Sequence, residues 1–281
     1  MSGTERSGGG GASRTLLVTG ASTGIGLEVA KAAAAAGWTV AAGMRKPYDV
    51  PGVDVRELDV TDPDSVAACV AGVVADHGRL DALVNNAGVG NTVPTIELAD
   101  LAAFRANIEV NFFGVVAMTK AALPHLRAAG GRLVTVGSTR GLVGQPFNEA
   151  YCAAKFAVEG FLEALAPVAA GMGVRVVIVE PGPVLGTAFA ANTGVTRDSL
   201  LAGAGPYEPV LRPYLDWVAR TAWPGAQPAE EVAGIVLRAL TEPDPPPRVL
   251  TSDWAREFAG VKLADADGTA VRRLAREWLT G

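Results

Sequence analysis

Cysteine and histidine are scarce in this sequence of 281 residues, which contains two of each. The two cysteines, Cys69 and Cys152, are too few for a disulfide framework, and two histidines leave little for a metal site. We therefore expect a reducing compartment and no bound metal. Blocks of like charge are missing too, since 24 Lys and Arg stand against 29 Asp and Glu, a net charge of −5. This balance argues against a broad surface for nucleic acid.

Long apolar runs are also missing. No run reaches the about 18 residues that a helix needs to cross a bilayer, so we expect no membrane span. Residues 1–13 are rich in Gly and Ser and lack the apolar core of a signal peptide. We expect this segment to be a flexible tail and the protein to be cytoplasmic.

From Arg14 onward, short β-branched runs alternate with longer, Ala-rich helical runs. Several of the expected strands are apolar throughout, as is typical of parallel strands that helices cover on both sheet faces. The pattern predicts an α/β fold, a single doubly wound Rossmann domain over residues 14–281 with a seven-stranded parallel sheet. The expected strands are Thr15–Thr19, Thr39–Gly43, Val53–Glu57, Ala82–Asn85, Arg132–Gly137, Val174–Glu180 and Arg248–Thr251. The expected helices include Ile25–Ala36, Asp64–Asp76, Leu98–Ala129 and Ala150–Ala170.

Residues 190–223 break this rhythm, because the segment is rich in loop residues and carries Tyr207, Tyr214, Trp217 and Trp223. Two interpretations stay open and are compatible. The segment is a surface helical hairpin that packs its aromatic rings on the core, or it is a helical lid over a substrate pocket. The second follows because ligands bind at strand ends and insertions there often cover them.

A glycine-rich turn follows the first expected strand, with the spacing G-x-x-x-G-x-G from Gly20 to Gly26. A strand-to-helix turn leaves unpaired N–H groups at the helix start, where the helix dipole is positive. Glycines let a pyrophosphate approach these groups closely. A turn of this kind alone is a weak signal, but its position after the first strand favours dinucleotide binding.

The end of the second expected strand indicates which dinucleotide is bound. Proteins that prefer NAD carry an acidic residue there for the ribose hydroxyls. Here Gly43-Met44 is followed by two cations, Arg45 and Lys46, which suit a ribose 2′-phosphate. We therefore expect NADP(H) in preference to NAD(H). The alternative is that the two cations are a solvated end of a loop.

Tyr151 and Lys155 lie four residues apart at the start of an expected helix, so they share one helix face. A lysine ammonium nearby favours the phenolate and can lower the pKa of a tyrosine, ordinarily about 10, by about 1–3 units. The phenol could then exchange a proton with an alcohol. Ser138 ends the preceding strand and could bind the reacting oxygen. Together with the glycine turn, these three residues form a specific pattern.

Further motifs follow in order: Asp59-Val60, Asn85-Asn86-Ala87-Gly88, Asn111 and Pro181-Gly182-Pro183-Val184. In this combination the sequence resembles the short-chain dehydrogenase/reductase family, in its non-extended branch, from Thr15 to Thr187. The stretch from Gly141 to Asn148 is most similar to that of the hydroxysteroid and retinol dehydrogenases. So are Met44-Arg45 and the segment from Pro228 to Ala233.

The resemblance implies a role for each matching residue. Tyr151 is expected to be the general acid in reduction and the base in oxidation, and Lys155 to lower its pKa and hold the nicotinamide ribose. Ser138 is expected to orient the substrate oxygen, and Asn111 to support a proton relay through water. The implied cofactor-binding residues are Gly20, Ser22, Thr23, Gly24, Ile25, Gly26, Arg45, Asp59, Val60, Asn86, Ala87, Gly88, Tyr151, Lys155, Pro181, Gly182, Val184 and Thr187.

Structural alternatives remain for two of these residues, since Asn111 could be a buried polar bridge and Asp59 a helix cap. The sequence also departs from the family twice. Thr187 is the sixth residue after Pro181, where relatives often have threonine at the fifth, which makes its contact uncertain. The connection Lys46 to Gly52 is short, so we expect a turn in place of a helix.

These features predict an oxidoreductase that moves a hydride between NADPH and a secondary alcohol/ketone or aldehyde pair. The apolar residues Leu142, Val143, Pro146 and Phe147 favour a hydrophobic substrate. The alternatives are a non-catalytic NADP-binding sensor and an epimerase or dehydratase of nucleotide sugars. The resemblance also implies a homodimer or homotetramer that pairs through the two long helices.

Overall fold

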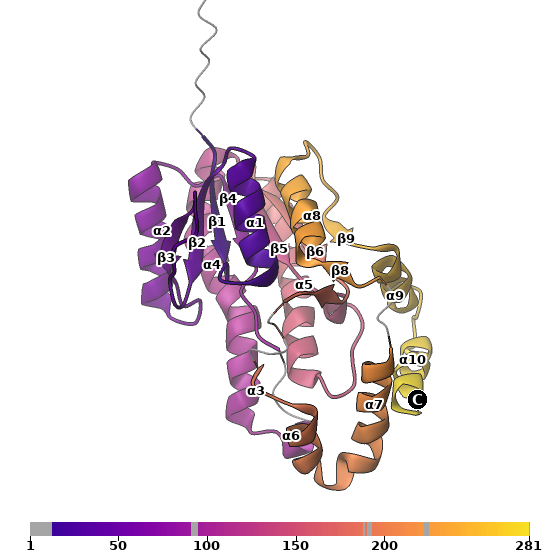
Figure 1. The fold of residues 1–281 in the computed structure, drawn as a ribbon. Helices are drawn as coiled ribbons and strands as arrows, with labels where there is room; N and C mark the ends of the chain where they lie inside the picture. Colours follow the sequence, from indigo (N-terminus) through magenta and orange to yellow (C-terminus); the bar gives the residue numbers. More distant parts are fainter. Residues whose placement is uncertain (1–12, 91–94, 188, 190–192, 222–224, 281) are drawn as a thin grey trace, which may run out of the picture.

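The computed structural model describes residues 13–90, 95–187, 189, 193–221 and 225–280. Within these ranges seven parallel strands form one sheet in the order β3-β2-β1-β4-β5-β6-β9 (Figure 1). This confirms the predicted fold. The strands are β1 (Thr15–Thr19), β2 (Thr39–Met44), β3 (Asp54–Glu57), β4 (Ala82–Asn85), β5 (Arg132–Val136), β6 (Arg175–Glu180) and β9 (Arg248–Leu250). The predicted bounds were wrong by one residue at several strand ends.

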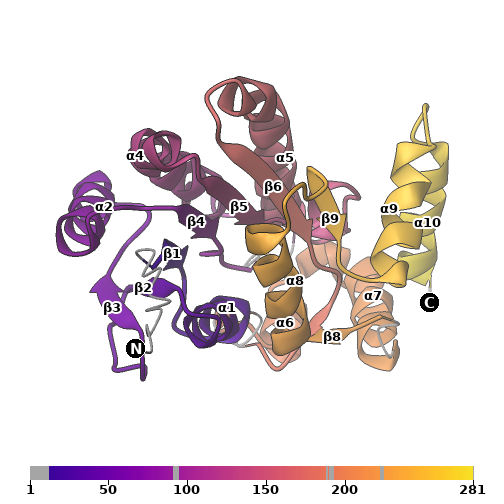
Figure 2. The same ribbon diagram turned by 90° about the horizontal axis from the view of Figure 1, so that it is seen from above.

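Helices cover both faces of the sheet, as the view from above shows (Figure 2). One face carries α1 (Gly24–Ala35) and α8 (Ala229–Thr241), and the other carries α2 (Pro63–His77), α4 (Gly114–Ala129) and α5 (Glu149–Ala170). Every side chain of β1 and β4 is buried. The sheet therefore lies between two apolar clusters, which explains why its central strands have no alternating polar positions.

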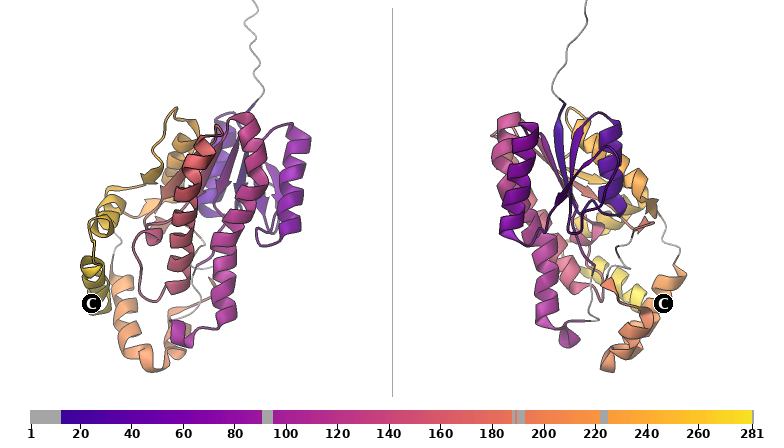
Figure 3. Two further views of the ribbon diagram at one scale, coloured as in Figure 1. Left: turned by 180° about the vertical axis from the view of Figure 1, so that it is seen from behind. Right: turned by 60° about the vertical axis from the view of Figure 1, so that its left-hand side comes forward.

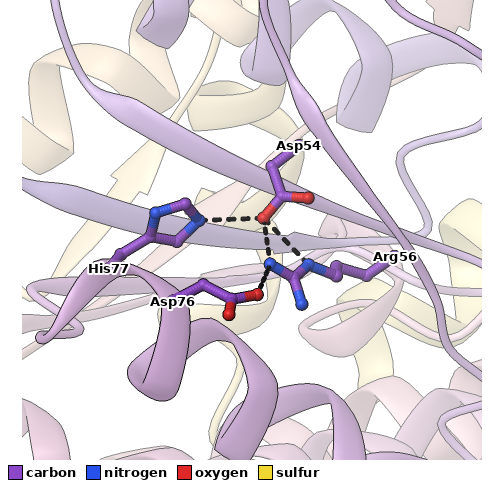
Figure 4. Close-up of polar contacts among 4 residues, drawn as sticks. All are labelled: Asp54, Arg56, Asp76 and His77. Carbon is purple, nitrogen blue, oxygen red and sulfur yellow. Dashed lines mark hydrogen bonds and ion pairs between the residues drawn. The ribbon is translucent and has the colours of Figure 1, made fainter.

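Polar contacts rather than apolar packing join the edge strand β3 to α2 (Figure 4). Asp54 accepts hydrogen bonds from Arg56 Nε at 2.8 Å and His77 Nε2 at 2.8 Å. Arg56 also pairs with Asp76 at 2.6 Å. Gly78 ends the helix in the left-handed conformation with φ 73°. The short connection between β2 and β3, described throughout, contains no helix, as predicted.

The predicted helix Leu98–Ala129 is wrong in detail. The chain forms a short 3₁₀ turn, η1 (Ile96–Leu98), then α3 (Leu101–Ile108), a π-helical turn η2 (Glu109–Phe113) and α4. By length and composition alone the run Leu101–Ala129 could cross a membrane, a test that core helices of soluble proteins also pass. The expected absence of a membrane span stays a prediction.

A helical region lies beyond the carboxyl edge of the sheet (Figures 1 and 3). It comprises α6 (Arg197–Ala202), the 3₁₀ turn η5 (Gly205–Tyr207) and α7 (Glu208–Arg220), followed later by α9 (Asp253–Leu263) and α10 (Thr269–Thr280). A small second sheet pairs β7 (Val184–Leu185) with β8 (Gln227–Pro228). Tyr214 and Phe258 are buried in an apolar cluster that this region forms with Leu142 and Val143. The helical hairpin is therefore present, and its action as a lid stays a prediction.

Parts of two predicted segments fall outside the described residues. They are residues 1–12 of the tail, and residues 190–192, 222 and 223 of the hairpin, including Trp223.

Candidate active site

The glycine turn after β1 is packed tightly against the chain that leaves β4. Gly20 has φ +64°, and a Cβ added there would lie 2.6 Å from Cα of Ala87. A Cβ on Gly26 would lie 2.3 Å from Asn86 Nδ2. That amide donates to the carbonyl oxygens of Thr19 and Gly20 at 3.0 and 3.1 Å. A side chain at either position would clash, so both positions require glycine.

The amino end of α1 faces outward beside this turn. Its N-cap, Thr23, is exposed and makes no capping hydrogen bond with any described residue. The first N–H groups of the helix therefore keep their capacity to donate to an anion. Ser22 precedes them, and Ile25 packs on the core below. This arrangement fits the phosphates of a dinucleotide.

The end of β2 carries two exposed cations, Arg45 and Lys46. Tyr48 reaches back from the following turn and donates to the carbonyl oxygen of Ser22 at 2.7 Å. Asp59 accepts hydrogen bonds from the N–H and hydroxyl of Thr61 at 2.9 and 2.7 Å. Those bonds, aided by the charge of Arg45, lower the pKa of Asp59 against the effect of its partial burial.

Asp59 does not cap α2. The cap is Asp62, whose side chain accepts from Asp64 N at 2.9 Å. Val60 is buried and lies against Gly114, where a Cβ would come within 2.7 Å of its methyl group. The structure therefore brings the pair Asp59-Val60 to the edge of the sheet that also holds Arg45, and its contact with an adenine stays a prediction.

Ser138, Tyr151 and Lys155 come together between β5 and α5. Ser138 follows β5 and caps a 3₁₀ turn, η3 (Thr139–Gly141), where its Oγ accepts from Arg140 N at 3.1 Å. The Ser138 hydroxyl lies close enough to the Tyr151 phenol to act against the effect of burial on its pKa. Lys155 Nζ lies 5.7 Å from the centre of the Tyr151 ring and donates to the carbonyl oxygen of Val136 at 3.0 Å. The predicted triad is therefore one cluster in space.

The expected lowering of the Tyr151 pKa is wrong for this structure. Burial raises the pKa of Tyr151 to about 12, and the nearby hydroxyl of Ser138 only partly opposes it. Lys155 does not lower the pKa of Tyr151 to match, because its ammonium donates to Val136 O. Burial also lowers the pKa of Lys155 itself to about 8. In this state the phenol keeps its proton.

Asn111 is wholly buried in the π-helical turn η2. Its Nδ2 donates to the carbonyl oxygens of Val89 and Asn107 at 2.9 and 3.0 Å, and its Oδ1 accepts from Val89 N at 3.1 Å. A Cβ on Gly88 would approach that Oδ1 to 2.9 Å. Asn111 thus bridges two segments, as the structural alternative proposed. A part in proton transfer stays a prediction.

The chain after β6 completes the site. Pro181 O accepts from Thr139 N at 3.0 Å, and Gly182 lies against the ring of Trp254. Val184 begins β7, and Gly186 then adopts φ +69°. This left-handed residue bulges the chain, so Thr187 lies beside Gly24, 3.1 Å from the position of an added Cβ. The extra residue in the loop therefore leaves Thr187 at the glycine turn.

The predicted residues thus gather along the carboxyl edge of β1, β2, β4, β5 and β6. The sequence matches the short chain dehydrogenase family over residues 14–198. The chain belongs to this family.

Among full-length relatives of this short-chain dehydrogenase are enzymes of the hydroxysteroid and retinol type. Retinol dehydrogenase 8 of Bos taurus is 34% identical, over 93% of this chain and 89% of its own. Human 17-beta-hydroxysteroid dehydrogenase type 1 is 34% identical, over 90% of this chain and 82% of its own. A short chain dehydrogenase from Burkholderia cenocepacia J2315, solved in complex with NADP, is 28% identical with TM-score 0.72 over 95% and 98% of the chains. The protein is thus an oxidoreductase of alcohol and carbonyl groups that uses a nicotinamide cofactor.

Two residues at the site of this short-chain dehydrogenase, Phe189 and Glu180, were not predicted from the sequence, and Phe147, predicted only as part of an apolar stretch, has an unexpected backbone conformation. The ring of Phe189 meets that of Tyr151 edge to face at 5.5 Å. Phe147 has φ 57°, rare for a non-glycine residue, and its ring lies 5.2 Å from that of Tyr214. Glu180 is wholly buried at the end of β6. An acidic residue directly after the apolar run Val176–Val179 was the available signal for Glu180.

Proposed function

We propose that this short-chain dehydrogenase is an NADP(H)-dependent oxidoreductase that transfers a hydride between the nicotinamide and a hydrophobic secondary alcohol/ketone or aldehyde. Tyr151 acts as the acid and base. The observation that carries this proposal is the cluster of Ser138, Tyr151 and Lys155, in which Lys155 Nζ lies 5.7 Å from the centre of the Tyr151 ring. The cluster lies at the same carboxyl edge of the sheet as the glycine turn. Their roles are proposed here from chemistry and from family resemblance.

The residues around the glycine turn fit a dinucleotide. The N–H groups at the start of α1 would bind the pyrophosphate, and Gly20 and Gly26 allow its close approach. The exposed guanidinium of Arg45 would hold the 2′-phosphate of NADP through charge-assisted hydrogen bonds. An NADP complex in a relative that is 28% identical supports this choice. When bound, the nicotinamide supplies or accepts the hydride.

In the reducing direction, Tyr151 donates its proton to the carbonyl oxygen as negative charge develops there. Ser138 donates a hydrogen bond to the same oxygen and stabilises that charge. The raised pKa of Tyr151, caused by burial, keeps the phenol in the proton-donating form. Lys155, when its ammonium is charged, stabilises the phenolate that remains.

A hydrophobic substrate is favoured by the groups beyond Tyr151. Leu142 and Val143 pack with Tyr214 of α7, and Phe147 contacts Tyr214. These side chains are largely buried against one another, and the apolar cluster that they form beyond Tyr151 favours a ligand with a large apolar body. We also propose that the protein is cytoplasmic and forms a homodimer or homotetramer through α4 and α5. A light-scattering mass equal to that of a monomer would refute this assembly.

The decisive experiment compares wild type with Tyr151→Phe on a panel of hydrophobic ketones and aldehydes. Oxidation of NADPH, faster than that of NADH, is expected in the wild type and should be lost in the variant. Cofactor binding, followed by nicotinamide fluorescence, should persist in both. If neither protein turns over any substrate while both bind NADPH, the result favours the alternative function, a non-catalytic NADP-binding sensor. A preference for NADH would remove the role of Arg45.

A further inference from the structure

Glu180 is a wholly buried carboxyl group at the carboxyl end of β6, directly before Pro181. Neither of its oxygens has a hydrogen-bond donor among the residues that the structure describes. A buried carboxylate without a donor is strongly disfavoured, so the group either holds a proton or shares one. The space for this carboxyl is provided by Gly137, where a Cβ would lie 2.7 Å from Glu180 Oε1.

The neighbour of Glu180 is a second buried carboxyl, Glu159 of α5. Glu159 lies close enough to Glu180 to raise the pKa of that carboxyl. Carboxylates accept hydrogen bonds only, so two buried carboxyl groups at this proximity favour one proton on the pair. Arg248 of β9 donates to Glu159 Oε2 from Nη2 at 2.6 Å and from Nε at 3.2 Å. Arg248 thus places its positive charge beside Glu159, whereas neither oxygen of Glu180 has a donor among the described residues.

The pair lies beside Lys155, one helical turn before Glu159 on α5. Burial lowers the pKa of Lys155 to about 8, and the charges of Glu180 and Glu159 act in the opposite direction. Burial, followed by the contact with Glu159, raises the pKa of Glu180 well above its usual range. The other titratable or charged groups near this cluster are Tyr151, Arg140 beside Tyr151, Arg248, and the exposed Glu163, which is 3.5 Å from Arg248.

We propose that Glu180 and Glu159 are a buried carboxyl pair that shares one proton, carries one negative charge and holds Lys155 in its ammonium form. Glu180 is then a positioning residue that acts through Lys155 and touches neither substrate nor cofactor. The effect on turnover rests on the function proposed above for Lys155. The shared proton and the charge state of Lys155 are properties of the protein alone.

The test uses Glu180→Gln, Glu159→Gln and the double variant, with Glu163→Gln as the matched control on the same helix. In wild type at neutral pH, infrared spectroscopy should show the C=O stretch of one protonated buried carboxyl. Each single variant should lose that band, because the remaining carboxyl ionises and keeps the single negative charge. Glu163→Gln should keep the band.

The double variant should remove the negative charge altogether. The chain contains five lysines, so the Cε resonance of Lys155 can be assigned with Lys155→Arg and titrated by NMR. Because an opposite charge nearby typically shifts a pKa by about 1–3 units, the Lys155 midpoint should fall by at least about one unit in the double variant. The two single variants and Glu163→Gln should shift it far less. The alkaline limb of kcat/KM for reduction should move in the same direction.

The absence of a protonated carboxyl band in wild type would overturn the proposal, and so would an unchanged Lys155 midpoint in a folded double variant. If the double variant does not fold, the band in the single variants still decides whether the proton is shared. A protein that turns over no carbonyl substrate but shows the band and the shifted midpoint would refute the proposed function and leave the carboxyl pair standing.

Discussion

Replacing Gly26 by alanine should damage both the stability of the fold and the binding of the cofactor. An alanine Cβ would lie 2.3 Å from Asn86 Nδ2 and 2.6 Å from Gly20 O, well inside van der Waals contact. Overpacking of this kind costs about 1–3 kcal/mol. The added carbon also displaces the amide of Asn86, whose two hydrogen bonds to the glycine turn contribute about 1 kcal/mol each. Together these effects predict a loss of about 3–5 kcal/mol in the free energy of unfolding.

The matched control for this variant is Gly260→Ala in α9, where an added Cβ meets nothing within 4 Å. Alanine is favoured over glycine in a helix interior by up to about 1 kcal/mol, so this variant should be as stable as wild type or more stable. Urea unfolding measures both free energies. Fluorescence titration should show NADPH binding at least about tenfold weaker in Gly26→Ala alone, a change of about 1.4 kcal/mol. Equal stability and equal NADPH affinity of the two variants would refute the reasoning.

Three further predictions concern charge. Arg45→Gln should raise the Kd for NADPH about 10–100-fold, since a hydrogen bond to a charged group contributes about 1.5–3 kcal/mol, and should leave the Kd for NADH unchanged in a fluorescence titration. In the wild type, kcat/KM for reduction should decline as pH rises through about 8, the pKa to which burial lowers Lys155; a rate that stays flat well above that pH would contradict a charged Lys155. Burial raises the pKa of Asp54, but the hydrogen bonds from Arg56 and His77 outweigh it, so the pKa is lowered in the folded protein. Ionised Asp54 therefore stabilises the fold above its unfolded pKa of about 3.9, and this stabilisation is lost as pH falls through its folded pKa. Asp54→Asn should therefore be less stable than wild type in urea at neutral pH and equal to it in strong acid.

The sheet and the glycine turn could be predicted because each depends on local sequence. Strands that are buried on both faces have continuous apolar runs, and Gly20 and Gly26 are the residues that a close turn requires. The Tyr151–Lys155 spacing likewise follows from one helical turn. In each case a local pattern in the sequence marks the feature, although the space that requires Gly20 and Gly26 is set by Ala87 and Asn86 in the chain after β4.

The π-helical turn Glu109–Phe113 and the bulge at Gly186 could not be predicted in the same way. A π turn has nearly the apolar pattern of an α-helix. The hydrogen bond of Asn111 to Val89 joins it to a segment distant in the chain, in addition to its local bond to Asn107. Thr187 lies one residue further from Pro181 than the threonine of many relatives. The left-handed conformation of Gly186 accommodates this extra residue in the loop. This effect of Gly186 becomes clear only from the structure, where Thr187 lies next to Gly24 of α1.

The pKa of Tyr151 shows most clearly that the spacing of two residues in the sequence does not determine their electrostatic interaction. Four residues of separation predict that Lys155 lowers it, but a charge acts on the phenol only as strongly as the surrounding burial and the direction of the ammonium allow. Here Phe189 packs on the phenol ring, burial raises its pKa to about 12, and the ammonium of Lys155 is held at Val136 O. The charge of Lys155 itself depends on Glu180 and Glu159. The proton transfer that we propose at Tyr151 would therefore depend on residues from β5, α5 and β6 together. The Tyr–Lys motif alone does not reveal Glu180 and Glu159, the carboxyl groups that we propose keep Lys155 charged.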